Sequence, residues 1–313
     1  MHTIGIDMSK DTFHVAFDDA TVLIFQNSTA GVNEFIQELE KRSCSRDNTL
    51  IGTESTGVYH LLLCQTLSSK NWKIKVINPL LAHRMFKSNL RYAKTDRHDA
   101  VSIRKVLLEG VGYLYTDTPE TLALKALVQE RDSLAKIRSG LRQRIHVHKS
   151  RQKASKIILR DNFNGVLKLL THEIYEIEKE MSKYSVETQS LLRSIPGVGK
   201  ITAASLVAYV GDINRFPSAK QLTAYMGLDL RLCESGTSVH GKSFLTKRGN
   251  RHLRFVLFNA AYRAMNNNPD LKQYFAKKIS EGKHYFSAMC AVERKMVHLI
   301  YAVWKRGIPF EVR

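Results

Sequence analysis

The sequence is poor in acidic residues relative to basic ones. Its 313 residues include 29 Asp and Glu against 48 Lys and Arg, a formal net charge of +19. Such an imbalance destabilises the compact state through self-repulsion, so it indicates a polyanionic partner. Nucleic acid fits this better than an anionic membrane because basic residues recur along the whole chain.

Paired cysteines and long apolar runs are also lacking. Cys44, Cys64, Cys233 and Cys290 lie far apart and form no CxxC pair, so neither a zinc ribbon nor a disulfide framework is indicated. No stretch approaches the ~20 apolar residues of a membrane span. The N-terminus, MHTIGIDMSK, lacks the pattern of a secretory leader. We therefore expect a cytoplasmic protein with no membrane partner.

Residues 1–115 have the pattern of an α/β domain. Apolar or alternating runs predict strands at 2–7, 12–17, 21–26, 49–53 and 73–77, and helices at 29–42 and 58–68. The order β-β-β-α-β-α-β-α is typical of a mixed sheet with three antiparallel strands followed by parallel ones. An RNase H-like domain has this order.

The chain after position 96 is predicted to be mainly helical. Helices at 119–155 and 163–184 would form an antiparallel hairpin or coiled coil, either a packed bundle or an arm that dimerises or carries nucleic acid. We expect domain boundaries at 1–115, 116–188 and 189–313.

Residues 131–160 are strongly basic, and their only acid is Asp132. A solvated helix face usually mixes charges of both signs. We therefore predict contact with a phosphate backbone. The candidate residues are Arg138, Arg142, Arg144, Lys149, Arg151 and Lys153.

Four acids occupy the ends of predicted elements. Asp7 ends the first strand, Glu54 follows the fourth, and Asp96 and Asp99 share one face of a later helix. A cluster of four carboxylates is unfavourable without cations, and two Mg²⁺ ions would resolve the repulsion. Paired metals can clamp the attacking and leaving oxygens in phosphoryl transfer. Any one of these acids alone fits a surface charge or helix cap equally well.

The segment 194–200, SIPGVGK, places Gly197, Gly199 and Lys200 at the start of a helix. Backbone N–H groups in such a turn can bind phosphate, as in helix-hairpin-helix proteins. A tight connection between two helices needs the same glycines.

Residues 228–250 are rich in glycine and hydroxyl groups and carry Lys242, Lys247 and Arg248, the pattern of a loop over phosphates. A serine here could attack a phosphodiester if a base, metal or cation activates it. The chemistry of the residues does not choose among Ser235, Ser238 and Ser243.

Several motifs occur together in a specific order: GIDMSKDTFHVA, TESTGVYH, VINPLLAHRM, KTDRHDA, SIPGVGKITAA, AYMGLDLRLCESGTSVHGKS and KRGNRHLR. Through them nearly the whole chain resembles the DEDD-type transposases of the insertion-sequence-110 family, relatives of the Piv DNA invertase.

The resemblance implies a RuvC-like N-terminal domain, a coiled-coil segment and a mainly α C-terminal domain with an essential serine. Asp7, Glu54, Asp96 and Asp99 match the family's Mg²⁺-binding residues, and Ser235 matches its serine, which is proposed to form a covalent phosphoserine linkage to DNA. Donor and target DNA, a guide RNA and a homo-oligomer, dimer or tetramer, with sites shared between subunits are implied as partners.

Three alternatives stay open at this stage. A site-specific DNA invertase would use the same residues. A metal-dependent junction nuclease would need the carboxylates without the serine. A non-catalytic nucleic-acid-binding protein would need only the basic helices and the glycine turn.

Overall fold

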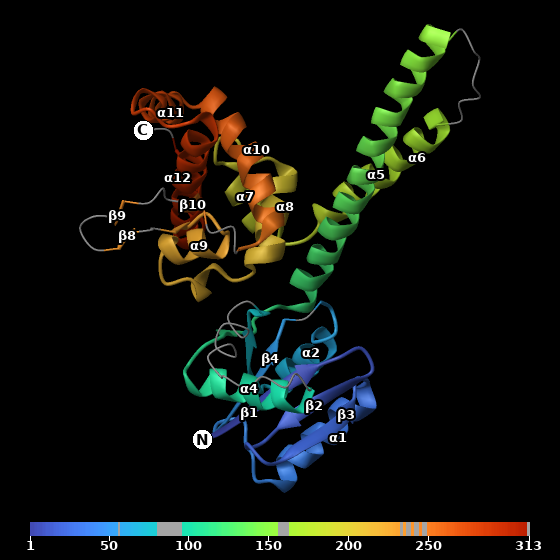
Figure 1. The fold of residues 1–313 in the computed structure, drawn as a ribbon, viewed down its shortest axis with the longest axis vertical. Coiled ribbons are helices and arrows are strands. Elements are labelled where there is room, and N and C mark those ends of the chain that lie inside the picture. Colours follow the sequence, from blue (N-terminus) through green and yellow to red (C-terminus); the bar gives the residue numbers. More distant parts are fainter. Residues whose placement is uncertain are drawn as a thin grey trace. The chain divides into compact units, whose positions relative to one another are not determined.

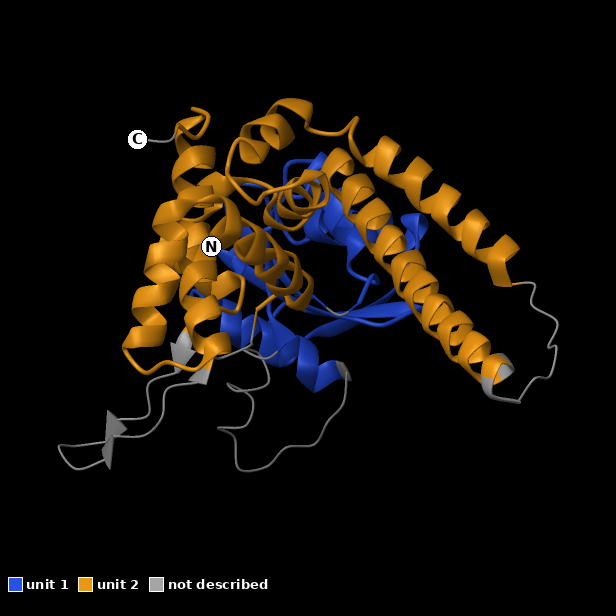
Figure 2. Ribbon diagram, turned by 90° about the horizontal axis from the view of Figure 1, so that it is seen from above, with its two compact units in different colours: residues 1–118 blue, residues 119–313 orange. Residues whose placement is uncertain are grey.

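The computed structural model describes residues 1–55, 57–79, 96–155, 163–231, 234–235, 239–240, 244–245 and 249–311. At positions 96, 152, 154–155, 230–231, 234–235, 239–240 and 244 it describes the backbone alone. The chain forms two compact units, Met1–Thr118 and Pro119–Arg313 (Figures 1 and 2). The two long helices belong to the second of these units. The three domains expected from the sequence, 1–115, 116–188 and 189–313, stay a prediction.

Unit 1 is built on a mixed sheet with strand order β3-β2-β1-β4-β5-β6. The first three strands are antiparallel neighbours, and β4 is parallel to both β1 and β5. The strands are β1 (His2–Met8), β2 (Thr12–Ala16), β3 (Val22–Gln26), β4 (Thr49–Glu54), β5 (Lys73–Ile77) and β6 (Tyr113–Leu114). The predicted order of strands and helices is confirmed. The two-residue β6 was not predicted because so short a strand carries no periodic signal.

Helices cover both faces of this sheet. Ile4, Ile6 and Ile51 pack with α1 (Thr29–Lys41) and α2 (Leu61–Ser69) in one apolar cluster. On the other face, α4 (Asp96–Leu108) packs Ile103 and Leu107 into a second cluster. The two-residue alternation of β1 and β4 separates these faces.

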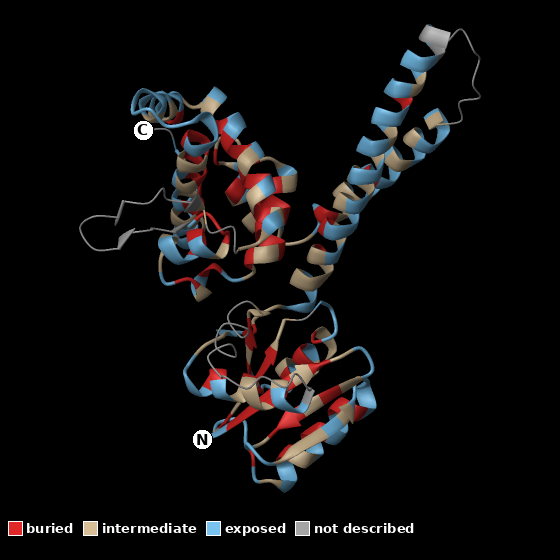
Figure 3. Cartoon of the chain, in the orientation of Figure 1, coloured by how far each residue is buried: buried red, intermediate tan, exposed pale blue. Residues whose placement is uncertain are grey.

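Two long helices open unit 2. α5 (Pro119–Ser155) and α6 (Phe163–Met181) pack against each other, and both start where the sequence predicted. Figure 3 shows that the outer parts of both helices are mostly exposed. The inner part of α5 is different, because Leu124 and Val128 are fully buried in the C-terminal core.

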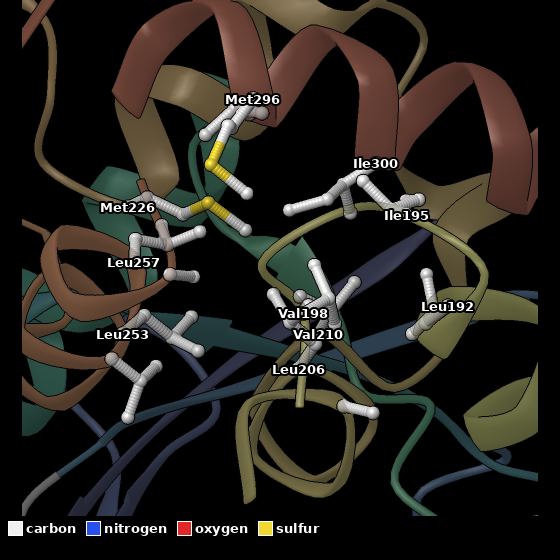
Figure 4. Packing of buried hydrophobic residues seen from close by; sticks show 14 of the residues in the cluster. Leu192, Ile195, Val198, Leu206, Val210, Met226, Leu253, Leu257, Met296 and Ile300 are labelled. Atoms are coloured by element: carbon white, nitrogen blue, oxygen red, sulfur yellow. The ribbon is translucent and has the colours of Figure 1, made fainter. Parts of the chain in front are cut away.

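The remainder of unit 2 is a helical cluster around one apolar core (Figure 4). Leu206, Leu253 and Ile300 are among its fully buried side chains. The helices are α7 (Val186–Arg193), α8 (Lys200–Val210), the short η1 (Ile213–Arg215), α9 (Ala219–Tyr225), α10 (Arg251–Asn267), α11 (Pro269–Ser280) and α12 (Tyr285–Arg306). No helix in the described ranges is long and apolar enough to cross a membrane.

The segment predicted as a loop at 228–250 contains short strands. β7 (Leu230–Arg231) pairs with β10 (Phe244–Leu245), and β8 (Glu234–Ser235) pairs with β9 (Val239–His240), both antiparallel. We call residues 230–245 the serine hairpin. The dense glycine and serine of this segment hid the strands from pattern analysis.

Candidate active site and nucleic-acid interface

Asp7 and Glu54 lie next to each other at the carboxyl ends of two neighbouring strands. β1 and β4 are parallel, and their register pairs Gly5 with Gly52 and Ile6 with Thr53. Asp7 and Glu54 are the next residues of each strand, so their side chains leave the same face of the sheet, with strands ~4.8 Å apart. Both side chains are half-buried. The two acids are therefore adjacent by backbone register.

Helix α4 covers that same face. A Cβ atom placed on Gly5 would lie 2.3 Å from the Ala100 carbonyl oxygen, and one on Gly52 would lie 2.3 Å from a Leu107 methyl carbon. Gly5 precedes Asp7 by two residues, and Ala100 directly follows Asp99. Because Gly5 and Gly52 have no side chain, α4, which begins with Asp96 and carries Asp99, can pack directly on β1 close to Asp7.

Salt bridges and hydrogen bonds fix α4 to the sheet. Arg104 Nε donates to the Thr3 carbonyl oxygen at 3.0 Å, and its NH1 lies 3.0 Å from Asp19 Oδ1. Arg97 donates to the Ala20 carbonyl oxygen at 2.6 Å. Because these contacts bracket Ala100 along the helix, they constrain how α4 can move over β1.

Asn27 joins the segments that follow the two acids. Its Nδ2 donates to the Ser9 carbonyl oxygen at 3.0 Å and to the Tyr59 carbonyl oxygen at 3.2 Å. Ser9 follows Asp7 by two residues, and Tyr59 follows Glu54 by five. The sequence analysis missed Asn27 because an Asn just before a helix reads as an ordinary turn residue.

The chemistry of these residues fits a hard divalent cation. Carboxylate oxygens are preferred ligands of Mg²⁺, which also keeps waters and accepts phosphate oxygens. Among the side chains that the structure describes, no three His, Cys, Asp or Glu gather closely enough to hold a metal ion. The side chain of Asp96 lies outside that set. The four-carboxylate site stays a prediction.

The serine hairpin has a tightly closed base. Asn250 N donates to the Tyr225 carbonyl oxygen at 3.1 Å, and Arg254 NH1 donates to the Gly249 carbonyl oxygen at 2.8 Å. A Cβ atom on Gly227, whose φ is +72°, would lie 2.6 Å from the Gly249 nitrogen. The two ends of the segment are thus held together. Within it, Ser235 pairs with Val239 in register, and its side chain lies outside the described residues.

Glu293 is a buried carboxylate near that base. It is only 3% exposed, and burial raises its pKa to about 7, while the positive charge of Arg254 opposes the rise. No sequence pattern marked it, because a lone Glu inside an amphipathic helix resembles a surface residue.

A second polar network connects three helices of unit 2. His252 Nδ1 lies 2.6 Å from Asp132 Oδ2, and His252 Nε2 lies 2.9 Å from Ser205 Oγ. Burial alone would raise the pKa of Asp132, but the hydrogen bond and charge of His252, aided by Arg131, lower it below 3.8. Asp132 was noted in the sequence only as the one acid of a basic stretch.

The predicted basic residues of α5 lie at the surface. Arg142, Arg144, Lys149, Arg151 and Lys153 are exposed, and Arg138 is half-buried. Positions 133–160 contain no Asp or Glu. A surface of one sign suits a polyanion, so phosphate contact here stays our prediction.

The glycine turn has a packing role in the structure. Gly197 has φ +88°, and a Cβ atom there would lie 2.4 Å from the Ala260 carbonyl oxygen of α10. Gly199 is the N-cap of α8, and Lys200 is exposed. The turn thus serves as the tight helix connection considered above, and a phosphate contact at Gly199 and Lys200 stays a prediction. Lys242, Lys247 and Arg248 lie outside the described residues.

Comparisons with known proteins place these features in a class. Residues 4–148 match a family model described as a transposase with a DEDD domain, and residues 189–276 match the transposase family IS116/IS110/IS902. The chain is therefore a transposase, an enzyme that transfers DNA phosphodiester bonds.

The two matches together span about three quarters of the chain. The chain belongs to the IS110 type of transposase, which mediates the transposition of insertion sequences. This confirms the resemblance seen in the sequence motifs.

Relatives extend over the full length. The chain is 29% identical to the pilin gene-inverting protein of Moraxella lacunata, over 99% of this chain and 98% of that protein. It is 25% identical to the transposase for insertion element IS1111A of Coxiella burnetii, over 97% and 89%. An uncharacterized protein of insertion element IS110 from Streptomyces coelicolor is 36% identical over 39% of this chain and 30% of its own length.

Proposed function

We propose that the chain cuts and rejoins DNA with two sets of groups, a carboxylate cluster of Asp7, Glu54, Asp96 and Asp99 in unit 1 and the Ser235 hydroxyl in unit 2. The observation that carries this proposal is the register of β1 and β4. It makes Asp7 and Glu54 neighbours on the face of the sheet that α4 covers.

The carboxylates would hold two Mg²⁺ ions, which supply positive charge to a phosphate group when bound. Asp7 and Glu54 lie on strands of a sheet, so the oxygens that they offer to the ions would be held rigidly. Asp96 and Asp99, one helical turn apart, would add oxygens from the covering helix. Four carboxylates would then face the phosphate with their repulsion neutralised.

Ser235 would act as the nucleophile. Its hydroxyl oxygen bonds to phosphorus as its proton is lost, and the bond from phosphorus to one deoxyribose oxygen breaks. That deoxyribose oxygen takes up a proton, so a phosphoserine link and a free DNA hydroxyl remain. The backbone pairing of Ser235 with Val239 supports a defined position for the serine on the hairpin.

The test is an excision assay in cells with the gene carried between its native flanking DNA. Asp7→Asn, Glu54→Gln, Asp96→Asn, Asp99→Asn and Ser235→Ala should each lower excision by about 100-fold or more. Asp47→Asn is the matched control. Asp47 is an exposed acid just before the amino end of β4, whereas Glu54 lies at the carboxyl end of that strand. The Asp47→Asn variant should keep wild-type excision.

Two further variants test which serine reacts. Ser238→Ala and Ser243→Ala should keep excision, and only Ser235→Ala should lose the covalent protein–DNA adduct trapped by denaturation. An adduct formed by the Ser235→Ala protein would overturn the assignment of the nucleophile, whereas cleavage without any adduct would favour a metal-only nuclease.

We propose that the active form is a homo-oligomer whose carboxylates and serine come from different subunits. The resemblance supports this, and a mixing experiment tests it. Asp7→Asn and Ser235→Ala proteins, each inactive alone, should regain activity when mixed if sites are shared in trans. An inactive mixture at a concentration where both variants form oligomers would contradict sharing.

We also propose an RNA guide, supported by the exposed single-sign surface of α5, which suits backbone contacts more than base contacts. RNA transcribed from the flanking DNA should co-purify with the protein. Degrading that RNA should abolish target selection.

Inversion of a DNA segment is a second candidate function. The full-length similarity to the pilin gene-inverting protein favours it. A plasmid with two oppositely oriented element ends distinguishes the two reactions, because inversion reorders the segment between them and transposition moves the element elsewhere.

A further inference from the structure

Helix α10 exposes large aromatic side chains on one face. Phe255 is 65% exposed and Tyr262 is 48% exposed, and they lie seven residues apart, on the same face. At the start of α12, Phe286 is 60% exposed. Aromatic rings normally contribute to cores, so several left in water within one unit mark an interaction surface.

One ring of α10, that of Phe258, stacks with rings at the start of α12. Phe286 stacks on Phe258 with ring centroids 6.2 Å apart and on His284 with centroids 5.8 Å apart. Phe258 follows Phe255 by one helical turn, which extends the aromatic surface along α10. A flat base could continue such a stack, since every base has an apolar π-face.

The charge around these rings is positive. α10 carries Arg251, Arg254 and Arg263 and contains no Asp or Glu. Arg251 and Arg263 are exposed, as is Lys283 beside the α12 rings. Aromatic rings among arginines suit a polyanionic strand with unpaired bases better than a second apolar protein surface.

The position of α10 in the chain favours a DNA strand as the ligand of its aromatic face. Its N-cap, Asn250, closes the base of the serine hairpin through its bond to Tyr225. Phe255 follows Asn250 by five residues, so the aromatic face begins next to the base of the serine hairpin, which carries Ser235. Cleavage and exchange of strands at that serine expose DNA bases without partners.

We propose that the aromatic face of Phe255, Tyr262 and Phe286, with Arg251 and Arg263 beside it, binds unpaired bases of single-stranded DNA by stacking. This deepens the proposed function and rests on it for the origin of the strand. The binding itself needs no catalysis.

The test is fluorescence anisotropy of the full-length Ser235→Ala protein with a labelled single-stranded DNA 12-mer and the matching duplex. Phe255→Ala and Phe286→Ala should each weaken single-strand binding by between about 5-fold and 100-fold. Duplex binding should stay within about 2-fold, because it depends on phosphate contacts. Phe255→Tyr should bind like the parent, and Phe255→Leu, apolar but without a ring, should bind weakly.

Tyr175→Ala is the matched control. Tyr175 is 62% exposed on α6, but Glu173, Glu176 and Glu178 flank it in the sequence and no Lys or Arg lies within three positions of it, unlike Phe255. Its variant should bind single strands normally. Circular dichroism and urea denaturation establish that all variants fold as the parent does.

Several results would overturn the proposal. They are unchanged single-strand DNA affinity in Phe255→Ala and Phe286→Ala, an affinity loss confined to RNA, and a drop in oligomer mass with unchanged DNA binding. Failure of the proposed catalytic role is a separate result. If Ser235→Ala keeps excision while the aromatic variants lose single-strand binding, the serine assignment fails and the aromatic site stands.

Discussion

His252 Nδ1 lies 2.6 Å from Asp132 Oδ2, and the other nitrogen of the same ring lies 2.9 Å from the Ser205 hydroxyl oxygen. The three residues come from α10, α5 and α8. Their order matches that of a nucleophile, base and acid, but Ser205 is fully buried, so no substrate reaches its hydroxyl. The network therefore ties the long helix α5 to the first turn of α10, which follows the serine hairpin.

Replacing His252 with Ala should destabilise unit 2 by about 2–4 kcal/mol, because Asp132 and Ser205 would lose a partner in a mostly buried site. Urea denaturation of the full chain measures this. Ser205→Ala should cost less, about 1 kcal/mol, since the His252–Asp132 pair survives. Equal stability of the His252→Ala and wild-type proteins would show that the network contributes nothing to folding.

Gly5 should be intolerant of any side chain. In Gly5→Ala the new methyl group would lie 2.3 Å from the Ala100 carbonyl oxygen and 2.4 Å from the Arg104 nitrogen, both backbone atoms. Because backbone cannot rotate away, α4 would shift, with a cost of about 2–4 kcal/mol and a loss of excision activity.

Gly140 provides the matched control. It lies inside α5, and an added Cβ would meet nothing within 4 Å. Gly140→Ala should therefore raise stability by about 0.5–1 kcal/mol, since alanine favours the helix. If Gly5→Ala left the midpoint of urea denaturation unchanged or raised it, as Gly140→Ala should, close packing of α4 on β1 would be contradicted.

Asn27 should affect catalysis more than stability. Asn27→Asp exchanges the donating Nδ2 for an oxygen, so the bonds to the Ser9 and Tyr59 carbonyls would be lost and replaced by repulsion. We expect excision to fall by about 10-fold or more, because misplacing a catalytic group by 1 Å can cost about 100-fold. Asn33→Asp, on the exposed side of α1, is the control and should keep wild-type excision. Normal excision by Asn27→Asp would remove Asn27 from the positioning of Asp7 and Glu54.

The sequence predicted unit 1 well because its signals are local. Apolar or alternating runs located β1 to β5, and Asp7 and Glu54 were recognised because each lies at or beside the end of a predicted strand. The order of the elements predicted three antiparallel strands followed by parallel ones, and the register shows that β1 and β4 are parallel neighbours.

Contacts between residues far apart in the chain could not be predicted from the sequence. Asn27 bonds to Tyr59 across 32 positions, and His252 meets Asp132 across 120, so no local period indicates either pair. The exposure of Phe255 could not be predicted from the sequence either, because an aromatic residue in a helix usually indicates a core position. Sequence motifs and periodicity thus pointed to the acids and the serine. Only the structure revealed contacts such as those of Asn27 and His252.

Glu293 should make stability fall as pH rises. Its pKa is about 7 in the folded chain against an ordinary 4.5, because burial disfavours the charged form. The stabilising effect of the neutral acid is complete below pH 4.5 and is lost as pH rises to about 7, by at most about 3 kcal/mol. Glu293→Gln, which cannot ionise, should lack this loss and be the more stable protein at pH 8. Urea denaturation between pH 5 and pH 8, in steps of ~0.5 pH unit, measures how the free energy of unfolding changes with pH.

Glu187, an exposed acid, provides the control, and Glu187→Gln should show the same pH dependence of stability as the wild type. If Glu293→Gln and wild type lost stability in parallel over this window, another group would cause the dependence, and the neutral state of Glu293 would be excluded.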